Sequence, residues 1–179
     1  MNLDATELFN AVQPGFFEKE YIRSLPEDEI FEEQILDLRT FSPEAVSISC
    51  PSHIRFGLYE GDMAKLHAAV CSVDESWLPY YTEKASIYCA FDGDRVVSFC
   101  LLDDFGEYQG LRIGAPGCVG TVPEYRRQGI GLKMVQNATV ILKQRGYDLG
   151  YIHYTGVGHW YARLGYETLL KWNARGIIR

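Results

Sequence analysis

Residues 119–135 constrain the fold of this chain more than any other stretch. Residues 119–122 are rich in β-branched side chains and predict the end of a strand, which Pro123 interrupts. From Ile130 onward the apolar residues recur with a helical period, in a stripe made of Ile130, Met134, Val135, Ala138, Ile141 and Leu142. The stretch therefore predicts a strand, a tight turn and an amphipathic helix, and the chain as a whole an α/β fold.

The turn between this strand and this helix contains two arginines and two glycines. Each glycine at a helix start costs about 0.5–1 kcal/mol relative to alanine, so Gly129 and Gly131 need a physical reason. The first N–H groups of a helix lack internal partners, and a missing Cβ lets an anion approach them. Arg126 and Arg127 add donors suited to phosphate. The turn predicts a polyphosphate site; the alternative is an ordinary strand-to-helix joint with a solvated arginine pair.

The sequence Arg126-Arg127-Gln128-Gly129-Ile130-Gly131 resembles the R/Q-x-x-G-x-G/A motif of the GNAT superfamily of N-acetyltransferases. The resemblance implies a mixed, mostly antiparallel central sheet of about six to seven strands flanked by helices, and acetyl-CoA as co-substrate. It also implies that pantetheine binds along the preceding strand and the pyrophosphate at the turn. The implied cofactor-binding residues are Val119, Gly120, Thr121, Arg126, Arg127, Gln128, Gly129, Ile130, Gly131 and Leu132. The turn has neither a Walker A ending nor a Rossmann G-x-G-x-x-G pattern.

Charge is distributed unevenly along the 179 residues. The net charge is −7, yet from Arg112 onward there are 10 basic and 3 acidic side chains. A multiply anionic cofactor would favour this basic half. The net negative charge of the whole chain and the lack of a basic stripe along a helix argue against a nucleic-acid-binding module. We find no leader or membrane-length apolar run, and the five cysteines show no C-x-x-C spacing. These features predict a cytoplasmic protein with buried free thiols, no metal and no membrane partner.

Residues 1–50 differ from the remainder, with 11 acidic and 3 basic side chains. We expect them to form an N-terminal extension that packs on a main domain of residues 51–179. Covering the active site and supporting a homodimer are both open roles for it. Ser24-Leu25-Pro26-Glu27 has the form of a capping box and predicts a helix over residues 25–38.

The main domain is expected to alternate strands and helices. The strands predicted by alternation and turn signals cover residues 54–59, 87–91, 95–102, 111–122, 149–154, 166–172 and 176–179. The predicted helices cover residues 63–71, with Asp62 as cap, 74–81, and 130–144, with Gly146 after its end.

Acetyl transfer from a thioester to an amine needs no protein nucleophile. It needs positioning, removal of a proton from the amine and protonation of the departing thiolate. The segment Tyr161-Ala162-Arg163-Leu164-Gly165-Tyr166 resembles the family's Y-x-x-x-G-F signature, which implies that Tyr161 is the acid. A packing role for this tyrosine is the alternative.

The base is less constrained, since the strand over residues 111–122 carries no carboxylate. His153 is the candidate because imidazole titrates near neutral pH. Asp103, Asp104 and His159 are rivals.

The function predicted is acetyl-CoA-dependent N-acetyl transfer to a small-molecule primary amine or an amino-terminal group. Trp77 and Tyr80 are candidates for binding the acceptor, with core packing as the alternative. A different class of function is a non-catalytic acetyl-CoA-binding regulator of the same fold.

Overall fold

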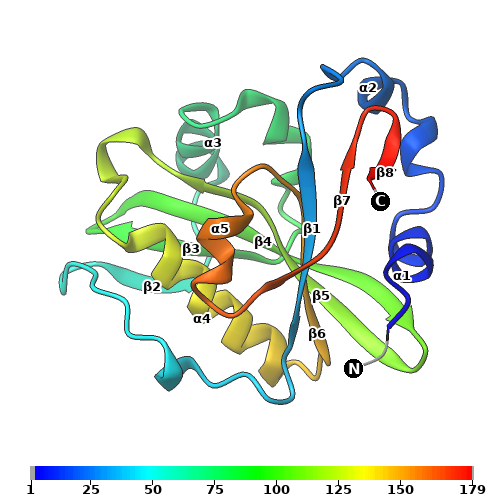
Figure 1. Ribbon diagram of the computed structural model, residues 1–179. Helices are drawn as coiled ribbons and strands as arrows, with labels where there is room; N and C mark the ends of the chain where they lie inside the picture. Colours follow the sequence, from blue (N-terminus) through cyan, green and yellow to red (C-terminus); the bar gives the residue numbers. More distant parts are fainter. Residues whose placement is uncertain (1–2, 179) are drawn as a thin grey trace.

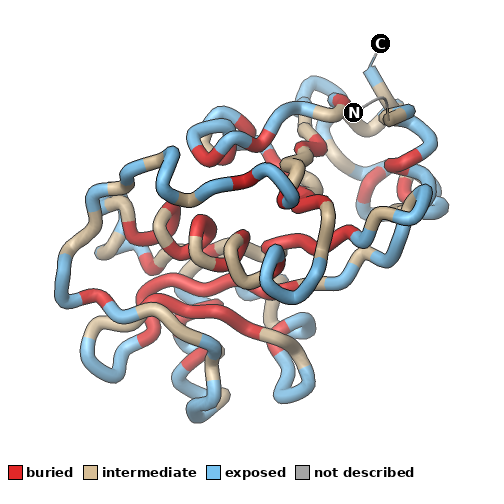
Figure 2. The backbone as a smooth tube through the Cα atoms, turned by 90° about the horizontal axis from the view of Figure 1, so that it is seen from below, coloured by how far each residue is buried: buried red, intermediate tan, exposed pale blue. Residues whose placement is uncertain are grey.

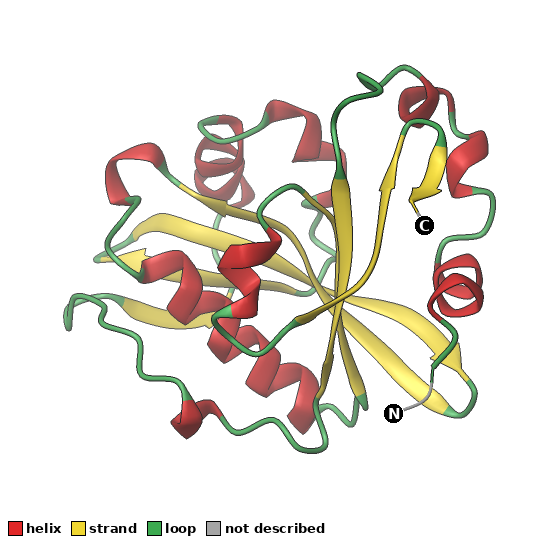
Figure 3. Cartoon of the chain, in the orientation of Figure 1, coloured by secondary structure: helices red, strands yellow, loops and turns green. Residues whose placement is uncertain are grey.

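The computed structural model describes residues 3–178, which form one eight-stranded sheet with helices on both faces (Figures 1 and 3). The strands are β1 Phe31–Asp37, β2 Arg55–Leu58, β3 Ile87–Asp92, β4 Arg95–Tyr108, β5 Leu111–Thr121, β6 Leu149–Thr155, β7 Glu167–Asn173 and β8 Gly176–Ile178. Their order is β2-β3-β4-β5-β6-β1-β7-β8. All neighbours are antiparallel except β5 and β6. The expected mixed, mostly antiparallel sheet is confirmed, with eight strands in place of six to seven.

The helices are α1 Ala5–Val12, α2 Glu20–Arg23, α3 Met63–Cys71, α4 Ile130–Gln144 and α5 Gly158–Ala162. Short 3₁₀ helices are η1 Phe16–Glu18, η2 Pro43–Ala45, η3 Glu75–Tyr80 and η4 Pro123–Tyr125. Both long helices of the main domain begin and end where the sequence predicts. Asp62 caps α3 by accepting from the N–H of Ala64 at 2.9 Å. Gly146 follows α4 with φ of 80°, which a C′ glycine adopts readily.

The helix predicted over residues 25–38 is wrong, because β1 occupies most of that segment. The Ser24 hydroxyl does not cap a following helix; it donates to the carbonyl of Tyr21 at the end of α2. β1 instead pairs with β6 on one side and β7 on the other. Hydrogen-bonded pairing on both sides stabilises the extended backbone more than a local capping pattern stabilises a helix. Residues 31–37 are therefore an interior strand of the same sheet as the main domain.

Glu33 of β1 is completely buried and joins three strands. Its carboxyl oxygens accept from Trp172 Nε1 on β7 at 2.7 Å and from the Tyr154 N–H on β6 at 3.1 Å. They also lie 2.9 and 3.1 Å from His153 Nδ1 on β6. A buried carboxyl group is tolerated only when its oxygens are satisfied in this way. Glu33 consequently fixes β1 between its two neighbours.

The two faces of the sheet carry different helices. Neighbouring residues of a strand point to opposite faces, and on β4 Phe99 packs with Leu66 of α3 whereas Cys100 packs with Met134 of α4. α1 lies on the α3 face, since its Leu8 packs against Ala115 of β5. Buried positions are concentrated in the central strands and α4 (Figure 2).

Residues 38–54 connect β1 to β2 by passing alongside α4 (Figure 1). We call this segment the α4 strap. The expected last strand ends at Ile178, and Arg179 lies outside the described residues.

The five cysteines are free thiols, but Cys71 is exposed and Cys50 and Cys118 are only partly buried, which corrects the expectation of burial. Within residues 3–178, no helix has the length and apolarity needed to cross a membrane.

We predict that Glu33→Ala lowers the free energy of unfolding by about 3 kcal/mol, because three donors lose their buried acceptor. Urea denaturation measures the change. The matched control is Glu29→Ala, an exposed residue before the strand, which should change stability by less than about 0.5 kcal/mol. A Glu33→Ala variant as stable as the control would show that Glu33 does not fix β1.

Candidate active site

The central feature of the site is the separation of β5 from β6. These parallel strands pair only at Ile113–Leu149 and Gly114–Gly150, although both continue well beyond those pairs. β6 stays paired with β1 up to Thr155, and β5 stays paired with β4 up to Thr121. The facing edges of the two strands are therefore open toward their C-terminal ends, as a ligand lying between them would require.

β5 contains a bulge at the open edge. Phe99 of β4 pairs with Gly120 and Leu101 pairs with Gly117, so Cys118 and Val119 both lie opposite Cys100. Cys118 has φ of 44°, which is uncommon for a residue with a side chain. The hydroxyl of Tyr81 donates to the Cys118 carbonyl at 2.6 Å and holds this conformation. The bulge changes the direction of the backbone N–H and C=O groups of β5 where this strand faces β6.

The end of β5 is fixed by hydroxyl and guanidinium contacts. Ser98 Oγ donates to the Gly120 carbonyl at 2.7 Å and lies 2.9 Å from Thr121 Oγ1. Arg126 Nε donates to the Thr121 carbonyl at 3.0 Å. Arg126 therefore ties the turn to the strand that it follows, in addition to adding charge.

α4 begins at Gly129, which has φ of 78° and gives the helix no side-chain cap. The Gly129 carbonyl accepts from Lys133 N–H at 2.9 Å. Within residues 3–178, the N–H groups of Ile130, Gly131 and Leu132 have no hydrogen-bond acceptor. A helix end with bare N–H groups and no capping side chain is suited to an anion.

The two glycines of the turn have packing reasons as well. A Cβ at Gly129 would collide with the carbonyl oxygen of Ser49 in the α4 strap, and its positive φ already disfavours other residues. A Cβ at Gly131 would lie 2.5 Å from Thr121 Oγ1. The sequence argument that both Cβ atoms are absent to admit an anion is thus incomplete, since the chain itself occupies these places.

A cavity of about 710 Å³ lies at the separated strands and the start of α4. Its lining contains every residue that the motif implied for cofactor binding, from Val119 to Thr121 and from Arg126 to Leu132. It also contains Ser47, Ile48 and Ser49 of the strap, Val73, Tyr125, and Val157, His159, Trp160, Tyr161 and Arg163 around α5.

The charges that line this cavity are all of one sign. Arg126, Arg127 and Arg163 contribute three guanidinium groups, and His159 adds an imidazole. None of the lining residues is Asp or Glu, although the chain carries 24 acidic residues. The cavity thus combines cationic side chains with free helix N–H groups, a donor set that fits a ligand bearing several phosphates.

Tyr161 lies in the wall of the cavity and is buried. Its ring packs edge-on against Trp160, with centroids 4.8 Å apart. Burial raises the pKa of the Tyr161 hydroxyl, and Cys100 and Tyr166 nearby raise it further. Within the described residues the Tyr161 hydroxyl has no hydrogen-bond partner. The protonated hydroxyl is therefore available to donate to a ligand in the cavity.

His153 does not line the cavity. It lies beside Glu33 on the face of the sheet that carries α1, with its ring centroid 5.0 Å from that of Phe16 and 6.1 Å from that of Phe105. Its Nδ1 is engaged by Glu33. The structure therefore separates the two predicted catalytic residues, Tyr161 and His153.

Among the rival bases, Asp103 lies closest to the bulge. Its carboxyl group occupies the place of a Cβ at Gly117, the residue before Cys118. Burial raises the pKa of Asp103 to about 6. Asp103 and Asp74 in turn act with burial to raise the pKa of the Cys118 thiol to about 12. Asp103 points to the face opposite α4, so it approaches the bulge from the side away from the cavity.

The other two rivals are placed differently. Asp104 accepts from the Gly106 N–H at 2.7 Å and lies 4.0 Å from Arg112, away from the cavity. His159 lines the cavity, as Arg163 does.

The two aromatic residues proposed for the acceptor do not line the cavity. Trp77 packs against the core cluster beneath α3, and Tyr80 is 59% exposed. Sequence reasoning missed Tyr81, which holds the bulge, and the strap residues. The sequence places Tyr81 only at the end of the helix predicted over residues 74–81, and no local pattern marks the strap.

Residues 83–168 match the family model described as "Acetyltransferase (GNAT) domain". The glucosamine N-acetyltransferase region of a fungal multi-domain β-N-acetylglucosaminidase is 24% identical, with a TM-score of 0.68 over 80% of this chain and 20% of that one. A GCN5-related N-acetyltransferase from Sphaerobacter thermophilus is 18% identical, with a TM-score of 0.59 over 79% of this chain and 49% of that one.

A third similar structure is the GCN5-related N-acetyltransferase from Kribbella flavida, 18% identical, with a TM-score of 0.57 over 80% of this chain and 56% of that one. This chain thus spans a fifth to little more than half of these proteins, and at such identities they show a shared fold. No curated protein sequence matches the chain. Residues 83–168 contain β3 to β6, α4, α5 and most of the cavity lining. These residues therefore match a GNAT acetyltransferase domain, and the N-terminal part of the chain adds β1 and the α4 strap to the same structure.

Proposed function

We propose that this protein is an N-acetyltransferase that uses acetyl-CoA as donor and a primary amine as acceptor. The observation that carries the proposal is the cavity at the separated strands, where unpaired N–H groups of α4 and three arginines meet without an acidic residue. The GNAT domain match supports acetyl transfer as the reaction. The amine acceptor and the acetyl-CoA donor are our inference.

The residues present fit acetyl-CoA. Its diphosphate would be held by the N–H groups of residues 130–132 and by Arg127, and its pantetheine arm by the backbone of β5 at Val119–Thr121, along the open edge. Arg163, which also lines the cavity, would add positive charge. The bound thioester supplies the acetyl group.

Tyr161 would protonate the departing sulfur. Its raised pKa keeps the hydroxyl protonated at neutral pH, and no internal hydrogen bond diverts it. A backbone N–H of the bulge, at Val119, would stabilise charge on the carbonyl oxygen. In balance, the amine nitrogen forms a bond to the acetyl carbon, the carbon–sulfur bond breaks, and the sulfur receives the proton of Tyr161.

Asp103 would accept the proton that the amine loses. It lies against Gly117 at the bulge, on the face of β5 away from the cavity, so an acceptor entering from that face would meet it first. A carboxyl group with a pKa of about 6 is ionised at neutral pH and is a stronger base than an ordinary aspartate.

The first test is binding and turnover with purified protein. We expect acetyl-CoA to bind, and free thiol to appear only when a primary amine is added, with the acetylated amine identified by mass spectrometry. Arg127→Ala should weaken acetyl-CoA binding about tenfold, or about 1.4 kcal/mol, because a charge-assisted contact to phosphate is lost.

The control for this test is Lys65→Ala, an exposed cation on α3 outside the cavity, which should bind normally. Binding without turnover on any amine of a broad panel would instead favour the regulator of the same fold. Absence of acetyl-CoA binding by the unaltered protein would overturn both functions.

A second prediction concerns Tyr161. Tyr161→Phe should lower kcat about 100-fold, since the ring still packs on Trp160 while the proton donor is lost. The dissociation constant for acetyl-CoA should stay within about twofold, because the hydroxyl is not assigned to ground-state binding. Tyr147→Phe, at a tyrosine outside the cavity, is the control. Equal kcat for the two variants would remove the acid role from Tyr161.

A third prediction concerns Asp103 and pH. The base must be ionised, so kcat/KM should rise with pH through an apparent pKa of about 6. Asp103→Asn should lower kcat/KM about 100-fold and abolish this acidic limb, with acetyl-CoA binding unchanged. Asp104→Asn, at the neighbouring carboxyl group on the other face, should leave both kcat/KM and its dependence on acidic pH unchanged. An acidic limb that persists in Asp103→Asn would exclude Asp103 as the base.

A further inference from the structure

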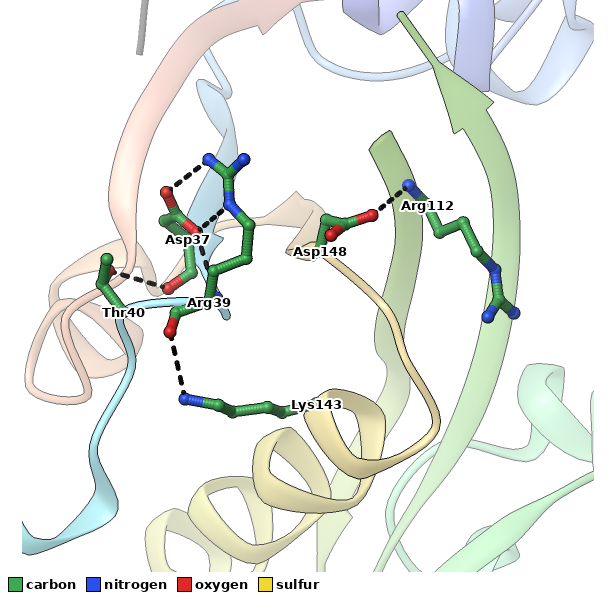
Figure 4. A network of polar contacts seen from close by, with 6 residues as sticks. All are labelled: Asp37, Arg39, Thr40, Arg112, Lys143 and Asp148. Atoms are coloured by element: carbon green, nitrogen blue, oxygen red, sulfur yellow. Dashed lines mark hydrogen bonds and ion pairs between the residues drawn. The ribbon is translucent and has the colours of Figure 1, made fainter. Parts of the chain in front are cut away.

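The α4 strap follows α4 along its whole length, in the opposite direction. Near the end of α4, Lys143 Nζ donates to the carbonyls of Arg39, at 3.3 Å, and Phe41, at 2.7 Å. Figure 4 shows Lys143 reaching from α4 to the strap. At the start of α4, the Ser49 carbonyl lies against Gly129. The start of the strap thus contacts the end of α4, and its later residues contact the start of α4, so the two segments run antiparallel.

Gln136, in the middle of α4, is the central anchor of the strap. Its side chain is fully buried, and Nε2 donates to the carbonyls of Pro43, at 3.0 Å, and Val46, at 2.8 Å. Lys133 Nζ donates to Gln136 Oε1 at 2.8 Å and completes its hydrogen bonding. A buried amide that satisfies two strap carbonyls holds this part of the strap in one position.

Beyond this anchor, residues 47–49 form part of the wall of the cavity at the start of α4. Ile48 packs against the core cluster below α4, and Ser47 and Ser49 on either side of it are exposed. Neither serine hydroxyl has a hydrogen-bond partner within the described residues. Two free hydroxyl groups therefore border the cavity that also contains the arginines and the free N–H groups of α4.

We infer that Ser47 and Ser49 bind the diphosphate of the CoA donor, and that Gln136 positions them. This rests on the proposed function and extends the donor site beyond residues 83–168, the part that matches the family model. The diphosphate is the group assigned because Ser49 touches Gly129, the residue whose following N–H groups are free. Hydroxyl groups complement such N–H donors around phosphate oxygens.

The charge along the strap agrees with this assignment. Glu44 is the acidic residue of the strap and lies in a separate groove beside Lys133 and Asn137, away from the serines. Residues 45–54 contain no carboxylate, although residues 1–44 contain eleven. The part of the strap that borders the cavity therefore brings no charge that would repel a phosphate.

The test compares three ligands on the Ser47→Ala/Ser49→Ala double variant by calorimetry. CoA and 3′-dephospho-CoA, which share the diphosphate, should both bind about tenfold more weakly than to the unaltered protein. Pantetheine, which has no phosphate, should bind equally to both. Ser52→Ala, an exposed serine of the strap outside the cavity, is the matched control and should change nothing.

Gln136→Leu tests the positioning role, with Lys143→Met as its control at the far end of the strap. We expect Gln136→Leu to weaken CoA binding about as much as the double serine variant, and to speed amide hydrogen exchange over residues 43–50. Lys143→Met should loosen residues 39–41 and leave CoA binding unchanged.

The outcomes separate this inference from the proposed function. Normal CoA binding by the unaltered protein and by the double serine variant would overturn the inference alone. A loss confined to CoA, with 3′-dephospho-CoA unaffected, would overturn the diphosphate assignment. No CoA binding by the unaltered protein would overturn the proposed function and this inference with it.

Discussion

The separation of β5 from β6 is the constraint on which the rest of the site depends. Two parallel strands that part after two pairs leave backbone groups unpaired at the facing edges, so each strand has to be held in place by its neighbour on the other side. β4 holds β5, and β1 holds β6 as far as Thr155. Glu33 then fixes β1 to both of its neighbours through buried hydrogen bonds. The N-terminal strand β1 thus supports one side of the open edge, although it lies outside the residues that match the GNAT model.

Charge is divided between the two faces of the sheet at this edge. On the face of α4 and α5, the cavity is lined by arginines and free N–H groups, whereas Asp103 approaches the bulge from the opposite face. A chain with net charge −7 would repel a polyphosphate at long range, so the local clustering of cations has to offset the overall charge. The same division leaves the carboxyl group of Asp103 on the face of β5 away from these cations.

Local signals predicted the parts of the fold that depend on local interactions. Asp62 caps α3, Gly146 ends α4, and the apolar stripe after Ile130 faces the sheet as the helical period requires. The segment around Glu33 could not be predicted in this way. Its pairing partners lie more than 100 residues away, and a buried glutamate reads in sequence as a solvated one. Tertiary pairing therefore overrode a capping pattern whose serine is used to end α2.

Local sequence signals also predicted only part of the candidate site. The motif residues line one cavity, but the sequence argument for Gly129 covers only part of the physics: Gly129 also lacks a Cβ because the Ser49 carbonyl lies where that atom would stand. No alternation or periodicity in residues 38–54 reveals that this segment lies along α4, since its anchors are backbone carbonyls that any sequence possesses. The side-chain clue is on the helix, where Gln136 and Lys143 share a polar face that lies beside the apolar stripe. A buried polar residue on a helix is thus a sign that another segment of chain crosses there, and here the crossing segment continues to the start of α4, where the N–H groups of residues 130–132 are free.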